Sequence, residues 1–154
     1  MLVDFNKLPG SSRIWIYASE KALNNNQQCY ILKSISKHLK RWKAHKLTLT
    51  GGVTILENHF IVVALDEEKN TASGCSIDTL QKTIQELEKT LAIVLMNRLN
   101  VFCKIEEVIK VIPCFKLGEI ANKDTLFYDL TIQRKDELDN YLKPIKNGWA
   151  ISYL

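Results

Sequence analysis

One short run, Ser73-Gly74-Cys75-Ser76-Ile77-Asp78, places a thiol, two hydroxyls and a carboxylate where a helix is expected to begin. The first turn of a helix leaves backbone N–H groups unpaired and carries a partial positive charge. Such a position can bind an anion or activate a thiol. The same residues can also simply cap the helix, with Cys75 packed as a small apolar side chain, and capping is common at helix starts. The run is therefore the first candidate for a functional site, and capping is the alternative.

Two kinds of chemistry are open to this run. In the first, the backbone amides of residues 74–76 hold a small anionic or polar ligand, or an acidic group of a protein partner. In the second, Cys75 is a nucleophile that uses His45 as its base, and Asp66 orients the histidine. The same amides would then stabilise an oxyanion. The sequence leaves both open and does not establish whether the protein is an enzyme.

A basic stretch from Lys37 to Lys46 precedes this run and contains Trp42. If the helix continues to His45, then His38, Trp42 and His45 share one face. This arrangement could offer an aromatic platform with a proton carrier, or follow a phosphate backbone as an RNA or protein interaction module. The alternatives are a core tryptophan and a solvated helix face. A net charge of only +4 argues against nucleic acid as the partner.

Two classes of site are not indicated. The four cysteines are widely spaced, and neither they nor the histidines show metal-ligand spacing, so no metal is predicted. Gly51-Gly52 does not belong to a Gly-x-x-x-x-Gly-Lys-Ser/Thr run, so the chain is not expected to be a P-loop ATPase. No cofactor is predicted.

The elements that must position these residues follow from hydrophobic periodicity. A helix from about residue 24 to 45 carries an apolar stripe, and a second helix after residue 76 carries apolar residues three and four apart, with Asp78 and Gln81 as its capping box. Phe60–Leu65 is apolar on both faces, as expected of a central strand, and Gly51-Gly52 suggests a bend or bulge. Other expected elements are strands at 13–18, 47–56, 101–104, 108–112, 125–128 and 149–153, a helix at 115–121 and a helical turn at 135–141.

The order of these elements predicts an α+β protein with a mixed or antiparallel sheet and two main helices. Through Lys104 the order is βαββαβ, which matches the ferredoxin-like arrangement. The 154 residues are expected to form one domain, with a core at about 13–104 and a β-rich C-terminal extension at about 105–154. Terminal strands could pair with a second copy, so a homodimer is considered.

Composition suggests a cytoplasmic protein. The start of the chain lacks the pattern of a signal peptide, and the longest apolar run, Leu91–Met96, is too short to cross a bilayer. The widely spaced cysteines are interpreted as free thiols.

The chain resembles an uncharacterised bacterial family. The resemblance is carried by Arg13-Ile14-Trp15-Ile16-Tyr17, Trp42-x-x-His45, Asp66, the six-residue run, Arg98-Leu99 and Trp149. Members are often labelled "ABC transporter ATPase", although the chain has no phosphate loop. The family tends to have Asp before the arginine, where this chain has Asn97. The resemblance implies no established activity, but it groups one set of residues as a site: Trp42, His45, Asp66, Ser73, Gly74, Cys75, Ser76, Asp78 and Arg98.

Overall fold

The computed structural model describes all 154 residues and confirms the α+β class with antiparallel sheets. The chain forms two compact units. The first unit contains Met1–Met96 and Gln133–Asp136, and the second contains Asn97–Ile132 and Glu137–Leu154. The boundary therefore falls at residues 96 and 97, before the strand that was expected to complete the core.

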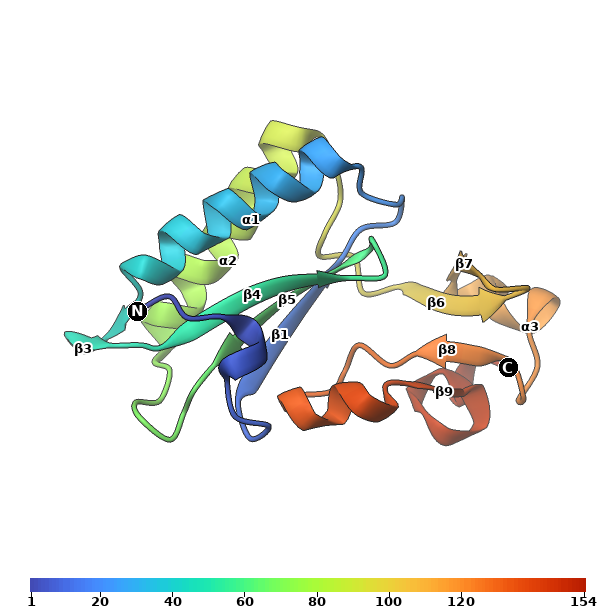
Figure 1. The fold of residues 1–154 in the computed structure, drawn as a ribbon. Helices are drawn as coiled ribbons and strands as arrows, with labels where there is room; N and C mark the ends of the chain where they lie inside the picture. Colours follow the sequence, from blue (N-terminus) through green and yellow to red (C-terminus); the bar gives the residue numbers. More distant parts are fainter. The chain divides into compact units, whose positions relative to one another are not determined.

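The first unit is a three-stranded antiparallel sheet covered by two helices (Figure 1). The strand order is β1-β5-β4, and β5 is central and buried at every residue, as its sequence predicted. The elements are β1 (Arg13–Ala18), α1 (Asn25–Lys40), β2 (Lys43–Ala44), β3 (Leu47–Thr48), β4 (Gly51–Leu56), β5 (Phe60–Leu65) and α2 (Gly74–Leu91).

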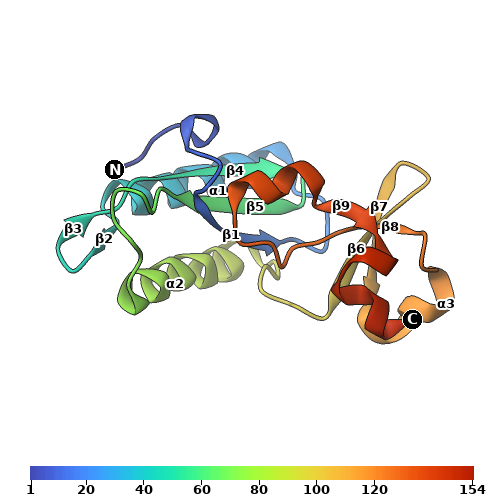
Figure 2. The same cartoon turned by 90° about the horizontal axis from the view of Figure 1, so that it is seen from below.

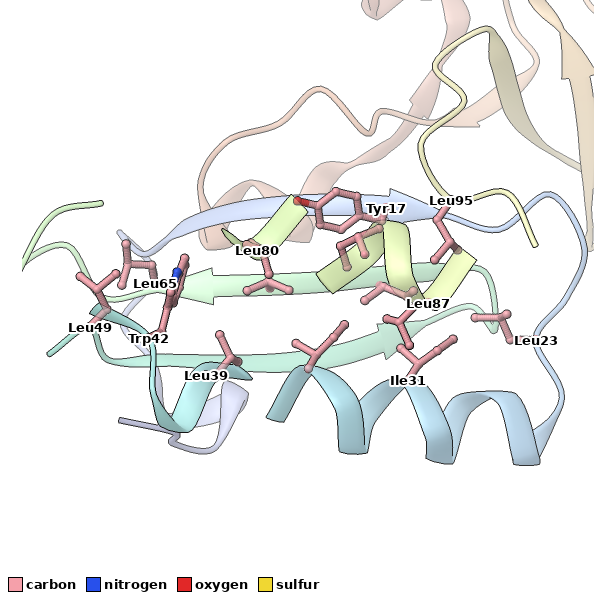
Figure 3. Packing of buried hydrophobic residues seen from close by; sticks show 14 of the residues in the cluster. Tyr17, Leu23, Ile31, Leu39, Trp42, Leu49, Leu65, Leu80, Leu87 and Leu95 are labelled. Carbon is pink, nitrogen blue, oxygen red and sulfur yellow. The ribbon is translucent and has the colours of Figure 1, made fainter. Parts of the chain in front are cut away.

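The core of the first unit lies between the sheet and both helices. Ile31 and Leu39 from α1 and Leu80 and Leu87 from α2 lie in one cluster with side chains of the sheet, among them Leu65, which lies beside Trp42 (Figure 3). These helix residues are the periodic apolar positions of the sequence, so the amphipathic pattern located both helices and their inner faces.

The fourth strand of the expected ferredoxin-like core is absent from this sheet. That arrangement needs the strand after α2 to join the sheet of the first three. Instead β6 (Asn100–Ile105) belongs to the second unit, and Gln133-Arg134 lies along β1. Ile14 N donates to Gln133 O at 3.0 Å, and Arg13 bridges Arg134. Hydrophobic pattern marks a strand but not its partner, which is why this part of the topology was wrong.

The second unit is a four-stranded antiparallel sheet of order β7-β6-β8-β9 with its own apolar core. The C-terminal residues Trp149–Tyr153, expected as a strand, form a 3-10 helix. Asp129 pairs with Lys143 at 3.1 Å between Oδ2 and Nζ. Burial alone would raise the pKa of Asp129, but hydrogen bonds from Thr131 and Lys143 outweigh it and lower the pKa. The other elements of this unit are β7 (Val108–Pro113), α3 (Leu117–Ile120), β8 (Leu126–Tyr128) and β9 (Leu142–Pro144).

The first helix ends five residues earlier than expected. It stops at Lys40, and the chain turns into the hairpin of β2 and β3, which contacts the beginning of α2 (Figure 2). The turn residues His45 and Lys46 have φ of 51° and 68°, and a two-residue type I′ hairpin turn requires positive φ at both central residues. Leu49 N donates to Trp42 O at 3.0 Å and closes the segment. His45 therefore lies on a hairpin and not on the helix.

The glycine pair in β4 permits a close approach of the N-terminal segment. The predicted bulge is wrong, because Gly51 and Gly52 pair in regular register with Leu65 and Ala64. A Cβ at Gly52 would lie 2.8 Å from the carbonyl oxygen of Val3. The absence of side chains thus allows backbone to pack directly on this strand.

Candidate functional site

The Ser73–Asp78 run begins α2, and its two serines cap the helix. Ser73 Oγ accepts from Ser76 N at 3.1 Å, and Ser76 Oγ accepts from Ser73 N at 2.8 Å. Ser76 Oγ also donates to Ser73 O at 2.7 Å. The predicted capping box of Asp78 and Gln81 is therefore wrong: the cap lies five residues before Asp78, which is exposed. Both hydroxyls have structural partners, and the exposed Gly74 and Cys75 carry the remaining amides of the first turn.

The structure does not join Cys75, His45 and Asp66 by hydrogen bonds. Cys75 is exposed, and no hydrogen bond links its thiol to a histidine. His45 is exposed in the hairpin turn. Asp66 is 6% exposed and accepts from Glu68 N at 3.1 Å, so its carboxylate stabilises the loop after β5. A nucleophile, its base and an orienting group need mutual hydrogen bonds, and this geometry shows none of them.

Trp42 connects the end of α1 to the beginning of α2. Its side chain is 2% exposed, and Nε1 donates to Ser76 O at 2.8 Å. Its ring centroid lies 5.8 Å from that of Trp15 and 6.0 Å from that of His38. The predicted neighbourhood of His38 and Trp42 is thus confirmed. His45 does not share their helical face, because the helix ends at Lys40 and His45 lies in the turn between β2 and β3. Trp42 is a buried support for the region rather than an exposed platform.

Arg98 belongs to the second unit and is exposed. The other members of the predicted site, from Trp42 to Asp78, all lie in the first unit. Within the first unit, the structure brings Trp42 and Ser76 together.

A pocket of about 630 Å³ lies between α1, β2 and α2. Its volume is in the range of small-molecule sites. Trp42 is the one residue of the predicted set that lines it, and the six-residue run lies beside it, because Thr79 follows on the next turn and its Oγ1 donates to Ser76 O at 2.9 Å. The lining residues are Tyr30, Ser34, Lys37, His38, Arg41, Trp42, Lys43, Thr79, Thr83, Glu86, Leu87 and Thr90.

Three cations surround this pocket, and none has a carboxylate partner. Lys37 and Arg41 come from the end of α1 and Lys43 from β2, and all three are exposed. The ion pairs of the protein involve other residues, and Glu86, the one acidic group of the lining, is also outside them. The pocket therefore has an excess of positive charge that the protein does not neutralise.

His38 is the titratable group of the pocket wall. Its Nδ1 lies 3.2 Å from Thr83 Oγ1, and its Nε2 is buried without a hydrogen-bond partner. Burial lowers the pKa of His38 below its ordinary value of 6.5, and the negative charge of Glu86 partly opposes this effect. The ring is accordingly neutral at pH 7.

Sequence reasoning found one wall of this pocket and missed the other. The basic stretch with Trp42 was recognised on α1. On α2 a polar stripe at spacings of four, three and four residues carried the missing signal. That stripe is Thr79, Thr83, Glu86 and Thr90.

No group of three His, Cys, Asp or Glu side chains is placed to hold a metal ion. No helix has the length and apolar character needed to cross a membrane. Comparison of the chain with protein-family models, with curated proteins and with solved structures gave no match.

Thiol labelling tests the catalytic interpretation of Cys75. Cys29 and Cys75 are exposed, whereas Cys103 and Cys114 are buried, and burial raises the pKa of Cys103 to about 11. We expect two thiols to react with an aromatic disulfide reagent in the folded protein and all four after unfolding, because the thiolate is the reacting species.

The matched variants are Cys29→Ser and Cys75→Ser. We expect the two exposed thiols to react at similar rates, because no base contacts either one. A Cys75 that reacts at least about tenfold faster than Cys29 would contradict this expectation and favour a thiol enzyme.

Proposed function

We propose that this protein binds a small anionic ligand in the pocket between α1 and α2. The observation that carries the proposal is the set of three unpaired cations, Lys37, Arg41 and Lys43, around a cavity of small-molecule size. Unpaired basic groups that converge on one concave surface attract an anion and fix its position.

The apolar part of the wall indicates that the ligand also has an apolar body. Leu87 and Trp42 are each 2% exposed and form part of the wall, and Tyr30, 44% exposed, flanks it. An aromatic or aliphatic portion would pack there while its acidic group meets the cations. The ligand class is thus a small organic acid or phosphorylated compound.

The six-residue run contacts two residues of the pocket wall through the carbonyl group of Ser76. The Ser76 carbonyl accepts both Trp42 Nε1 and Thr79 Oγ1, so the helix start positions two residues of the wall. This gives Ser73 and Ser76 a positioning role, in place of the direct ligand contact that the sequence suggested.

Neutralising the pocket cations tests the proposal. We expect a Lys37→Gln/Arg41→Gln variant to bind inorganic phosphate or 4-hydroxybenzoate about tenfold more weakly, since two exposed charge contacts are each worth somewhat under about 1 kcal/mol. Binding would be measured as saturable amide shifts of Thr79 and Thr83 in ¹⁵N-resolved NMR spectra.

The control is a Lys33→Gln/Lys40→Gln variant, which removes the same charge from the same helix outside the pocket. We expect it to bind almost as the unmodified protein does. An equal loss in both variants would show diffuse attraction to a basic helix, as for a polyanion such as RNA, and the absence of saturable shifts would overturn the proposal outright.

A further inference from the structure

His38 carries a buried polar atom that the protein does not satisfy. Its Nε2 has no hydrogen-bond partner, although the ring lines the pocket. Buried polar atoms are nearly always hydrogen-bonded, because an unpaired one costs about 1–3 kcal/mol. The ring of His38 lines a pocket with unpaired cations, so a ligand that reaches Nε2 would supply the missing partner.

The bonds of Thr83 define which kind of partner is needed. Thr83 Oγ1 donates its single proton to Thr79 O at 3.2 Å. The same oxygen lies 3.2 Å from Nδ1 of His38, and in the tautomer that accompanies the Thr79 bond it accepts from Nδ1–H. A neutral imidazole has one N–H, so in this tautomer Nε2 carries the lone pair and is an acceptor. The ligand atom that meets it must be a donor.

We propose that the pocket selects anions that also carry an O–H or N–H group, and that Nε2 of His38 accepts the hydrogen bond from this group. This inference rests on the anion-binding function proposed above and names the class of ligand. Hydroxy acids, amino-substituted acids and phosphates that retain a P–OH belong to this class, whereas sulfates and simple carboxylates do not.

Access to Nε2 requires a small movement of the wall, because neighbouring side chains cover the atom. Lys37 and Arg41, one residue before and three residues after His38, are exposed on the same end of the helix. Exposed side chains of this kind change rotamer within nanoseconds. The proposal therefore includes a side-chain movement in the wall that opens Nε2 to the ligand.

Two matched pairs of probes test the selection. Inorganic phosphate retains a P–OH at neutral pH and sulfate does not, which places the donor on the anion itself. The second pair, 4-hydroxybenzoate and 4-methoxybenzoate, places the donor beside the anion. We expect the donor-bearing member of at least one pair to bind about three- to tenfold more tightly at about pH 7.5, as one net hydrogen bond predicts. The pair that shows the preference identifies where the ligand carries its donor.

Two histidine variants test whether His38 causes the preference for donor-bearing anions. We expect His38→Phe to keep binding to the cations but to lose the preference, because phenylalanine fills the ring site without an acceptor. His45→Gln changes a histidine outside the pocket and should keep the preference. Binding of both members of both pairs with equal affinity would overturn the inference and leave anion binding intact. Failure of all four probes to bind would instead count against the proposed function.

The pH dependence of the ligand preference distinguishes a histidine that binds the ligand from one with a purely structural role, because only the former changes the preference when it is protonated. Protonation converts Nε2 from acceptor to donor, in a setting where Lys37, Arg41 and Lys43 oppose the new charge and Glu86 favours it. The benzoate pair keeps its ionisation between about pH 5.5 and 8. We expect the preference for 4-hydroxybenzoate to shrink as the pH falls and His38 becomes protonated. The NMR shift of the His38 ring protons measures this protonation. A preference that stays constant over a pH range in which the ring shift shows His38 being protonated would contradict the proposed acceptor role.

Discussion

Replacing Trp42 with alanine should lower the free energy of unfolding of the first unit by about 3–5 kcal/mol, the range for removing a buried large aromatic side chain. The side chain is 2% exposed, packs against Trp15 and His38, and donates to Ser76 O. Alanine would leave a cavity where three elements meet. Denaturant unfolding followed by far-ultraviolet circular dichroism measures the change.

A graded variant separates packing from the hydrogen bond. Trp42→Phe keeps most of the ring but removes Nε1. Ser76 O still accepts from Thr79 Oγ1, so the carbonyl is not orphaned and the expected cost is about 1–2 kcal/mol. Tyr30→Ala, an exposed aromatic beside the same pocket, should change stability by less than about 0.5 kcal/mol. A Trp42→Ala cost similar to that of Tyr30→Ala would contradict the structural role assigned to Trp42.

Gly148→Ala should destabilise the second unit by about 3 kcal/mol, at the upper end of typical overpacking costs. A Cβ at this position would overlap Cζ of Phe127, whose ring is fully buried. The backbone of Gly148 has φ −141°, which any residue adopts, so the whole effect is steric. Thermal unfolding and hydrogen exchange of amides in β8 and β9 measure the loss.

The matched control is Gly74→Ala, where no atom lies within 4 Å of the added Cβ. Position 74 opens α2, and alanine favours helix over glycine, so we expect unchanged stability or a gain of up to about 1 kcal/mol. A Phe127→Leu change should recover part of the Gly148→Ala loss, because it makes room at the contact. If Gly148→Ala is as stable as Gly74→Ala, the packing of Phe127 described here is wrong.

Local signals in the chain were sufficient for most elements. The spacing of apolar residues located both helices, and Phe60–Leu65 was correctly identified as a central buried strand. The turns at residues 57–58 and 106–107 join paired strands, and all four of these residues have positive φ. These features depend on neighbours in sequence, which periodicity and turn chemistry report directly.

Features that depend on distant partners were missed. The end of α1 was placed at His45 because Trp42 continues the apolar spacing, yet Trp42 is buried after the helix has ended. Gly51-Gly52 suggested a bend or bulge, whereas the backbone of Val3 lies too close to position 52 to leave room for a side chain. The strand after α2 joined a different sheet. In each case the structure depends on a contact with a segment far away in the sequence, and the spacing of residues does not identify such a segment.

By itself, the sequence determined an α+β chain, two amphipathic helices, a central strand and a helix start within the run Ser73–Asp78, because each of these is set by local pattern. Only the tertiary structure decided what surrounds that start. It leaves the thiol of Cys75 without a hydrogen bond to His45 or Asp66, uses both serines as caps, and places His38, Lys37 and Arg41 opposite Thr79 and Thr83. The physical reason is that a site between two helices depends on how their faces pack, and packing is a property of the folded chain.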